Sequence, residues 1–337
     1  MKIAIIGCGY WGTHLLRNFN QSEFWDLVGA CDLDENQIKK VKNNYPNLYT
    51  TNSIDDILNI QGLDAIVIST PVFSHFEIAE KSLKKGINTW IEKPMTSNSE
   101  DAQKLIDLSI ENNCIINIDH TYIYTPAVRK IKELITNGEL GEILYYDSIR
   151  INLGLFQHDV NVIWDLAPHD ISILNYLIDK KPTAVSATGS SVIKYNEKNL
   201  ESIAYITIYY EDNTLAHLNV NWLSPLKIRQ IIIGGSNKML VFDDMAVSEK
   251  IKVYDTGVKL TNREDIYETL VQYRIGDMYS PALPNKEALK EEVDHFYNCI
   301  KNKKNTDTDA HSGLLVVQII EAANKSLING GAKIELL

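Results

Sequence analysis

The sequence has few cysteines and no cysteine pair suited to a metal or a redox disulfide. It contains four, Cys8, Cys31, Cys114 and Cys299, and none of them forms a Cys-x-x-Cys spacing. A zinc knuckle or a redox dithiol is therefore not supported, and we predict no metal site. Cys8, Cys31 and Cys114 lie in apolar runs, where a cysteine is usually a small buried side chain. Reduced thiols of this kind are typical of a cytoplasmic protein.

Long apolar runs are missing as well. No stretch approaches the ~18 residues that a helix needs to cross a membrane. The apolar start of the chain is interrupted at once by Gly7 and Gly9, so it does not have the pattern of a secretory signal. We therefore expect a cytoplasmic protein with no membrane partner.

Positive charge is scarce. The chain has 33 Lys and Arg against 44 Asp and Glu, which gives a net charge of −11. An acidic surface repels the phosphate backbone, so nucleic acid is not an expected partner. A local basic pocket can still bind a small phosphate ligand. Hydrophobic residues make up 45% and charged residues 23% of the chain, which are ordinary values for a globular protein.

The length of 337 residues predicts two domains, because a single core stops growing near ~250–300 residues. In the first part, apolar strand patterns alternate with helical patterns, which is typical of an α/β fold with a doubly wound parallel sheet. The strand-like runs are Lys2–Ile6, Leu27–Cys31, Ala65–Ser69, Thr89–Ile91 and Ile115–Ile118. We place the first domain at residues 1–121 and the second at residues 122–337.

After Asp119 the pattern changes to long alternating strands. In Thr214–Trp222 the apolar residues share one face, and the turn Glu211-Asp212-Asn213 joins this segment to the run Ile203–Tyr210. Further strands are expected at Ile228–Ile233, Met239–Phe242 and Ile251–Tyr254, and helices at Thr125–Asn137, Trp164–Ile178, 286–302 and 309–329. The second domain is therefore predicted to be α+β, with a mostly antiparallel open sheet.

A glycine-rich motif follows the first predicted strand. Gly7, Gly9 and Gly12 form the pattern G-x-G-x-x-G, and a helical run begins directly after it. In this context the glycines permit a tight turn and a close approach of the backbone to a pyrophosphate, which the helix N-terminus stabilises. The motif predicts a Rossmann dinucleotide-binding domain.

Asp32 lies at the end of the second predicted strand, about 20 residues after the motif. A carboxylate at this position accepts hydrogen bonds from the adenosine ribose and repels a 2′-phosphate. The expected cofactor is therefore NAD, and NADP is disfavoured.

Two later strand ends carry polar residues where ligands bind in parallel sheets. Thr70 and Pro71 follow the third run, with His75 just inside the next helix, and Glu92-Lys93-Pro94 follow the fourth. From position alone, His75 is as readily an ordinary helix residue, and Lys93 reads first as a surface lysine.

In the second domain, Asp165 and His169 are four residues apart on a predicted helix and share a face. A histidine can act as an acid or a base near neutral pH, and a nearby carboxylate can orient it. An ordinary pair on a helix surface fits the spacing as well.

These motifs, in this order, resemble the glucose–fructose oxidoreductase, inositol dehydrogenase and rhizopine-catabolism (Gfo/Idh/MocA) family over nearly the whole chain. The resemblance implies that Lys93, His169 and Asp165 are catalytic and that Lys93-Pro94 is a cis peptide. It also implies a homodimer or homotetramer formed through the C-terminal sheet. The implied cofactor-binding residues are Gly7, Gly9, Tyr10, Trp11, Gly12, Asp32, Thr70, Pro71, His75, Glu92 and Lys93.

A finer resemblance is carried by Trp164–Asp170 and Trp222–Pro225, which are similar to family members of sugar-nucleotide and polysaccharide biosynthesis. It implies an NAD-dependent oxidoreductase that acts on a hydroxyl or keto group of a nucleotide sugar. A dehydrogenase of free inositol or a monosaccharide is the alternative enzyme, and a catalytically silent dinucleotide-binding sensor is the alternative of another class. Tyr124, Asn152 and Trp164 are candidate substrate contacts or packing residues. Arg150, Lys227 and Arg229 are candidate diphosphate contacts or solvated charges.

Overall fold

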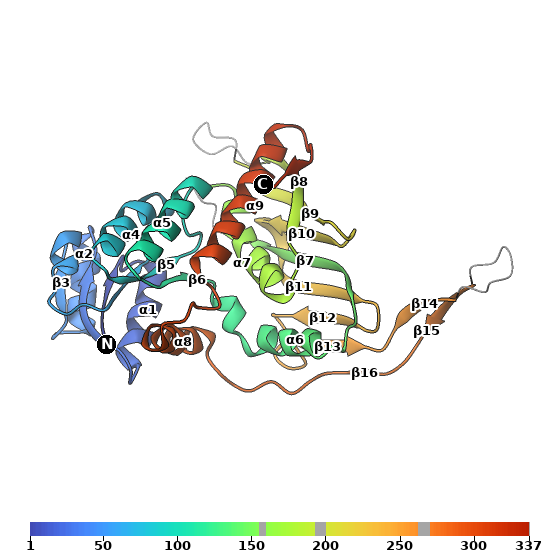
Figure 1. Cartoon of the computed structure of the whole chain (residues 1–337), viewed down its shortest axis with the longest axis horizontal. Coiled ribbons are helices and arrows are strands. Elements are labelled where there is room, and N and C mark those ends of the chain that lie inside the picture. The colour runs from blue at the N-terminus through green and yellow to red at the C-terminus, as the bar shows by residue number, and fades with distance from the viewer. Residues whose placement is uncertain (155–159, 193–199, 262–269, 337) are drawn as a thin grey trace. The chain divides into compact units, whose positions relative to one another are not determined.

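The computed structural model describes residues 1–154, 160–192, 200–261 and 270–336. Its contacts divide the chain into two compact units (Figure 1). The first unit joins Met1–Thr125 to Lys286–Gln318, and the second joins Pro126–Asn285 to Ile319–Leu337. Among the described residues, no helix is long and apolar enough to cross a membrane.

The first unit is built on a parallel sheet of six strands in the order β3-β2-β1-β4-β5-β6. Helices cover both faces of such a sheet, so its central strands are apolar without alternation, and β4 is buried along its whole length. The predicted doubly wound sheet is confirmed, and β3 is a short strand that the apolar pattern did not indicate. The strands are β1 (Lys2–Ile6), β2 (Asp26–Cys31), β3 (Tyr49–Thr51), β4 (Ala65–Ile68), β5 (Asn88–Glu92) and β6 (Ile116–Asp119).

Short polar side chains start three helices of this unit. Asp34, Ser53 and Asn98 each accept a backbone N–H from the first turn that follows them. Helix α1 differs, because its N-cap is Gly9, which has no side chain to do so. The first turn of α1 therefore remains available to another acceptor. The helices are α1 (Tyr10–Gln21), α2 (Glu35–Asn44), α3 (Ile54–Leu58), α4 (His75–Lys84) and α5 (Ser99–Glu111), with the 3₁₀ turns η1 (Val72–Ser74) and η2 (Thr121–Tyr124).

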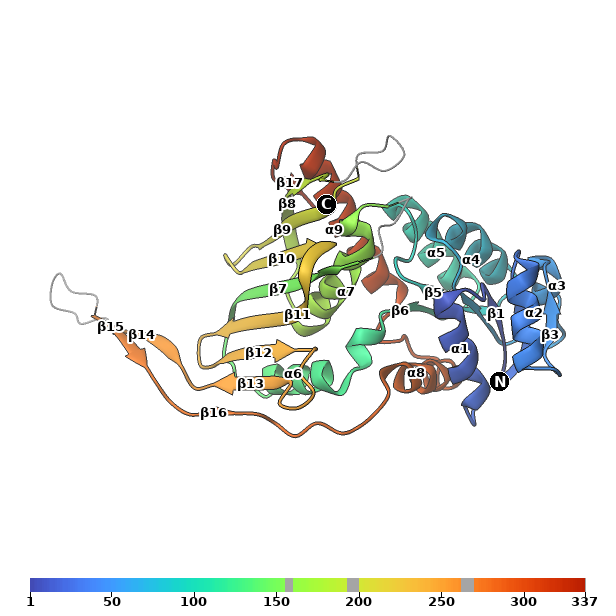
Figure 2. The same ribbon diagram turned by 180° about the vertical axis from the view of Figure 1, so that it is seen from behind.

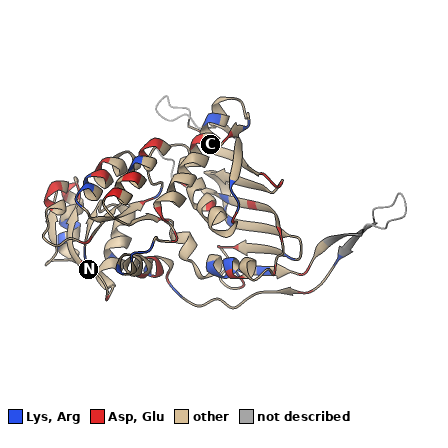
Figure 3. Ribbon diagram, viewed as in Figure 1, with Lys and Arg blue, Asp and Glu red and all other residues tan. Residues whose placement is uncertain are grey.

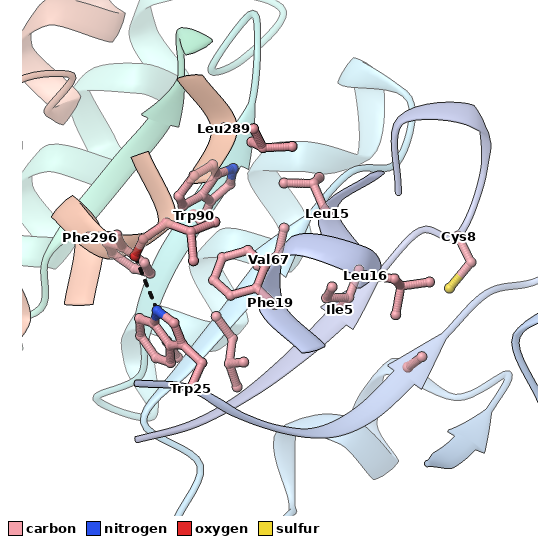
Figure 4. Packing of buried hydrophobic residues seen from close by; sticks show 14 of the residues in the cluster. Ile5, Cys8, Leu15, Leu16, Phe19, Trp25, Val67, Trp90, Leu289 and Phe296 are labelled. Carbon is pink, nitrogen blue, oxygen red and sulfur yellow. Dashed lines mark hydrogen bonds between the residues drawn. The ribbon is translucent and has the colours of Figure 1, made fainter. Parts of the chain in front are cut away.

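Helix α8 (Ala288–Asn302) completes the core of the first unit (Figure 4). Phe296 stacks on Trp25 with ring centroids 5.5 Å apart, and the Trp25 indole donates a hydrogen bond to the Val293 carbonyl (3.2 Å). The units therefore differ from the expected division into residues 1–121 and 122–337. Residues 286–318 pack with the first unit, and the boundary falls inside helix α9 (Ala310–Ile328).

The second unit contains a sheet of nine strands in the order β16-β13-β12-β11-β7-β10-β9-β8-β17. Of its described neighbouring strands, β7 and β10 pair in parallel and the others are antiparallel, so the predicted mostly antiparallel sheet is confirmed. Strands β7 and β8 were not predicted. The strands are β7 (Ile143–Leu153), β8 (Pro182–Ser190), β9 (Ile203–Tyr210), β10 (Leu215–Asn221), β11 (Leu223–Gly235), β12 (Met239–Asp243), β13 (Ile251–Tyr254), β16 (Met278–Tyr279) and β17 (Ile334–Glu335), and β14 (Gly257–Thr261) pairs separately with β15 (Leu270–Arg274).

One face of this sheet is covered by helix α7 (Val162–Leu177), which packs on β7, β9 and β10 (Figure 2). Helix α6 (Pro126–Thr136) packs in turn against α7. The alternation predicted for β10 is confirmed, because Ala216, Leu218 and Val220 are fully buried while His217 and Asn219 are half-buried.

Charge is mixed on the helices of the first unit. Figure 3 shows acidic residues along α4 and α5 with basic residues between them. Lys84 pairs with Glu80 and Lys104 with Glu100, each at 2.8 Å. Exposed pairs of this kind contribute little to stability, and these helices form no basic stripe of the type that binds nucleic acid.

Candidate functional site

The glycine-rich loop follows β1, and each of its three glycines is suited to its position for a different steric reason. Gly7 has a φ of +97°, and a Cβ there would lie 2.6 Å from the Ser69 carbonyl. At Gly12 a Cβ would lie 2.2 Å from the Gly7 oxygen, so only glycine lets α1 begin this close to β1. The Cβ position of Gly9 faces open space. A ligand can therefore approach the uncapped first turn of α1, where N–H groups favour an anion.

Asp32 directly follows β2 and is anchored to the same loop. Its Oδ2 accepts the N–H of Cys8 (2.6 Å), and its Oδ1 accepts the N–H of Asp34 (2.9 Å). Burial, and then the charge of Asp32, raises the pKa of the Cys8 thiol to about 12, so this thiol stays neutral. Each carboxylate oxygen of Asp32 retains a second lone pair, which is what a contact with the ribose hydroxyls requires.

We expect NAD to bind at least about tenfold more tightly than NADP, because Asp32 repels a 2′-phosphate. Asp32→Ser should narrow this preference, and Asp34→Ser, which alters the cap of α2 in the same loop, should not. Calorimetric titration with both cofactors measures the ratio. Equal or tighter NADP binding by the unaltered protein would show that Asp32 does not face the ribose.

Three exposed apolar side chains follow the ends of neighbouring strands of this sheet. Tyr10 follows β1, Leu33 follows β2 and Phe73 follows β4, and their exposed fractions are 85%, 81% and 70%. Apolar groups beside a few polar ones are typical of ligand sites, so these residues can flank the rings of a dinucleotide. Tyr10 was predicted from its place in the glycine-rich motif. Leu33 and Phe73 were not predicted, because a single apolar residue outside a regular run forms no periodic pattern.

The loop after β4 is braced by a buried histidine. His75 Nε2 lies 2.8 Å from the Thr70 carbonyl oxygen, and Nδ1 lies 3.0 Å from that of Pro94. Burial lowers the pKa of His75, so the ring is neutral at pH 7 and donates one N–H at a time. Thr70 and Pro71 remain accessible. The structure thus places His75 between the loops after β4 and β5 rather than on the ligand surface.

Lys93 lies directly after β5, where the peptide Lys93-Pro94 is cis, as predicted. The Glu92 carboxylate accepts the backbone N–H of Lys93. The lysine is half-buried, and its charge acts on the buried Asp119 and His120. Because β4 and β5 are parallel neighbours, Lys93 and Thr70 lie at the same edge of the sheet.

Two further candidate site residues of this unit, Trp11 and Tyr124, form side-chain hydrogen bonds. Trp11 donates its indole N–H to Asp119 Oδ2 (2.7 Å), which links the glycine-rich loop to the end of β6. Tyr124 is buried, and its hydroxyl lies 3.0 Å from Thr308 Oγ1. Of its two candidate roles, the structure favours packing over substrate contact for Tyr124.

In the second unit, Asp165 and His169 lie on α7 and are both half-buried. Asp165 Oδ2 accepts the indole N–H of Trp222 (2.9 Å). The backbone of Trp222 is itself fixed, since its N–H bonds to Ser202 and its carbonyl accepts from Gly154, each at 3.0 Å. An indole N–H can only donate. Asp165 is therefore held as an acceptor on the face that carries His169.

Arg150 is not available to a diphosphate, because it is buried in an ion pair with Asp170. Its Nε donates to Oδ2 of Asp170 (2.7 Å), and its Nη2 donates to Oδ1 of the same carboxylate (3.0 Å). Breaking such a buried pair costs roughly 3–5 kcal/mol. The pair instead fixes α7 to β7 beside His169.

The remaining candidates of this unit are accessible. Asn152 near the end of β7 and Trp164 in the first turn of α7 are half-buried, and Lys227 is exposed on β11. Arg229 lies 3.5 Å from Asp244 and is partly neutralised by it. The candidate substrate loop continues through residues 155–159, which lie outside the described residues.

The residues of the first unit fit a bound dinucleotide. The open Cβ position of Gly9 and the uncapped turn of α1 suit a pyrophosphate, and the Asp32 carboxylate suits a ribose. Lys93 and Thr70, at the ends of the neighbouring strands β5 and β4, provide polar groups that suit the nicotinamide half of the dinucleotide. When bound, NAD would supply the hydride acceptor.

Comparisons with known proteins agree with this geometry. Residues 1–120 match the GFO/IDH/MocA oxidoreductase family model, described as an NAD-binding Rossmann fold, and residues 128–241 match a C-terminal domain model of the same family. The UDP-N-acetylglucosamine 3-dehydrogenase of Acidithiobacillus ferrooxidans is 23% identical over 94% of each chain. The scyllo-inositol 2-dehydrogenase (NAD(+)) of Bacillus subtilis is 23% identical over 82% of this chain and 78% of that protein.

A solved structure is similar over the same length. The WlbA dehydrogenase of Bordetella pertussis, in complex with NADH and UDP-GlcNAcA, has a TM-score of 0.81 at 18% identity and covers 100% of this chain and 98% of its own. At this identity the likeness shows the fold. With both family models matched and the motifs in place, the chain belongs to the Gfo/Idh/MocA family of NAD-dependent oxidoreductases that act on CH–OH groups.

Proposed function

We propose that this enzyme transfers a hydride between a CH–OH group of a nucleotide sugar and the nicotinamide of NAD. The observation that carries the proposal is the hydrogen bond between Trp222 and Asp165. It joins the two segments, Trp164–Asp170 and Trp222–Pro225, that resemble the nucleotide-sugar members of the family. The similarity to a UDP-N-acetylglucosamine 3-dehydrogenase over 94% of each chain supports the same substrate class.

In the proposed oxidative reaction, an imidazole nitrogen of His169 accepts the hydroxyl proton. Lys93 Nζ donates a hydrogen bond to the developing alkoxide and lowers its energy. Asp165, held by Trp222, stabilises the imidazolium that forms at His169. NAD, when bound, supplies the hydride acceptor, and the reverse reaction uses the same groups with His169 as the acid.

A dehydrogenase of free inositol or a monosaccharide is the second candidate. The observation in its favour is that two of the candidate diphosphate contacts, Arg150 and Arg229, both lie against carboxylates. A diphosphate would need such charge, whereas an uncharged polyol would not. The scyllo-inositol dehydrogenase among the relatives is consistent with this alternative.

A substrate panel distinguishes the candidates. The protein with NAD is offered UDP-N-acetylglucosamine, its uronic acid, UDP-glucose, myo-inositol, scyllo-inositol and glucose, and NADH formation is followed by absorbance. We expect turnover with a nucleotide sugar, and turnover at least ~10²-fold lower with His169→Asn, which serves as the control for contaminating activity. Faster turnover of a polyol would favour the second candidate. Cofactor binding without hydride transfer to or from any sugar would indicate a sensor.

We also propose a homodimer or homotetramer formed through the face of the second sheet opposite helix α7. This face carries Tyr205, which is 43% exposed and stacks on His217 with ring centroids 6.2 Å apart. Exposed aromatic and amide groups suit an interface core. Sedimentation at micromolar concentration should show a dimer or larger species, and Tyr205→Lys should shift it toward monomer. A monomeric unaltered protein would contradict the proposal.

A further inference from the structure

Two carboxyl groups are buried at the end of β6 and have no part in the mechanism above. Asp119 is the last residue of β6 and is 2% exposed, and Glu292 on α8 is fully buried. Asp119 accepts two hydrogen bonds, from the Trp11 indole to Oδ2 (2.7 Å) and from the Thr121 hydroxyl to Oδ1. Glu292 accepts from the Asn117 amide at Oε1 (3.2 Å), and its Oε2 has no hydrogen-bond partner among the described residues.

The two groups differ in charge. Burial, and then the charge of Asp119, raises the pKa of Glu292 well above its usual range, so Glu292 is neutral at pH 7. Burial also raises the pKa of Asp119, but the hydrogen bonds from Thr121 and Trp11 and the charge of Lys93 oppose this rise. Two buried carboxyls that interact cannot both ionise easily. Asp119 has two hydrogen-bond donors, whereas Glu292 has the single amide of Asn117. This geometry assigns the negative charge of the pair to Asp119.

The two buried histidines on which the charge of Lys93 acts, His75 and His120, are uncharged. Burial lowers the pKa of His75, and burial together with the Lys93 charge lowers the pKa of His120 to about 3, so both rings are neutral at pH 7. Glu92 is half-buried, like Lys93, and its carboxylate accepts the backbone N–H of Lys93. Asp119 pairs in register with Glu92, the residue before Lys93, so it is the buried anion at the strand end next to Lys93.

We propose that Asp119 is a positioning residue whose charge sets the preference of the site for the oxidised over the reduced nicotinamide. The inference rests on the proposed function, in which Lys93 lies at the nicotinamide. The oxidised ring is positively charged and the reduced ring is neutral, so the Lys93 ammonium repels only the oxidised form. The charge of Asp119 is buried and therefore less screened by water than an exposed charge, so it offsets that repulsion. Its hydrogen bond from Trp11 links it to the glycine-rich loop and keeps it in place.

The test measures binding rather than turnover. Dissociation constants are measured for NAD by calorimetry and for NADH by fluorescence. Asp119→Asn should raise the ratio Kd(NAD)/Kd(NADH) about tenfold, which raises the midpoint potential of the bound couple by about 30 mV. Glu292→Gln replaces one neutral group by another and should leave the ratio within about twofold. Lys93→Met should change the ratio in the opposite direction.

Folding is checked by near-UV circular dichroism, since an amide at residue 119 must turn its NH₂ toward one of the two donors. Asp119→Ala has no polar group to misplace and serves as the second variant. If the unaltered protein binds neither cofactor, the proposed function is wrong. If it binds both, but the folded Asp119 variants keep the original ratio or Glu292→Gln changes it equally, the role of Asp119 alone is refuted.

Discussion

His169→Asn should lower kcat on the true substrate by ~10²–10⁴-fold, the usual effect of losing a positioned acid–base group. The asparagine amide cannot accept the hydroxyl proton near neutral pH. The affinity for NAD should be unchanged, because the glycine-rich loop and Asp32 belong to the first unit and His169 to the second. Steady-state kinetics and calorimetry on the same preparation separate these two effects.

His311→Asn provides the matched control, since His311 is exposed at the start of α9 and has no proposed role. A primary deuterium isotope effect on the unaltered enzyme establishes that hydride transfer limits kcat. With that established, near-normal turnover by His169→Asn would remove this residue from the mechanism. A bound water would then be the better candidate for the base, because Tyr124 is buried against Thr308.

Lys93→Met should lower kcat by a similar factor, ~10²–10³-fold, because it removes the proposed hydrogen-bond donor to the developing alkoxide. Methionine keeps the length of the apolar stem, so the loop after β5 should hold its conformation. Lys85→Met is the control: Lys85 is exposed and bonds to Asn59 Oδ1 at 2.6 Å. If Lys93→Met raised KM and left kcat unchanged, the lysine would bind substrate without stabilising the transition state.

The double variant of Lys93 and His169 tests whether the two residues act on one oxygen. Groups that serve the same atom in one step give effects that are far from additive. We therefore expect the double variant to be little slower than the slower single variant. Fully additive losses would mean that the two residues act in separate steps.

Much of the fold could be predicted because its signals are local. The run Lys2–Ile6 is apolar without alternation, and it forms β1 with the predicted bounds. The alternation through Ala216 and Leu218 likewise fixed which face of β10 is buried. Strand β7 was missed, since Asp147 and Arg150 interrupt its apolar pattern. The burial of Arg150 depends on Asp170 in another element.

The candidate site could be predicted where a sequence motif requires a particular backbone geometry. Gly7, Gly9 and Gly12 follow a strand and precede a helix, and their steric roles are those the pattern implies. The cis peptide at Lys93-Pro94 came from the family resemblance and is confirmed. Leu33 and Phe73 belong to no comparable motif. That they are exposed at the strand ends near the glycine-rich loop is known only from the three-dimensional structure.

The sequence by itself determined that a dinucleotide-binding parallel sheet comes first and a mostly antiparallel open sheet second. The reason is that apolar residues repeat every two residues in a half-buried strand and every three to four in a helix, so both patterns can be read from residues close together in the chain. Only the tertiary structure decided that α8 completes the first core, that Trp222 holds Asp165, and that Trp11 meets Asp119. Each of these contacts joins residues far apart in the chain. The charge of a buried group such as Asp119 is likewise decided by desolvation and by donors from other elements, and no local pattern records these effects.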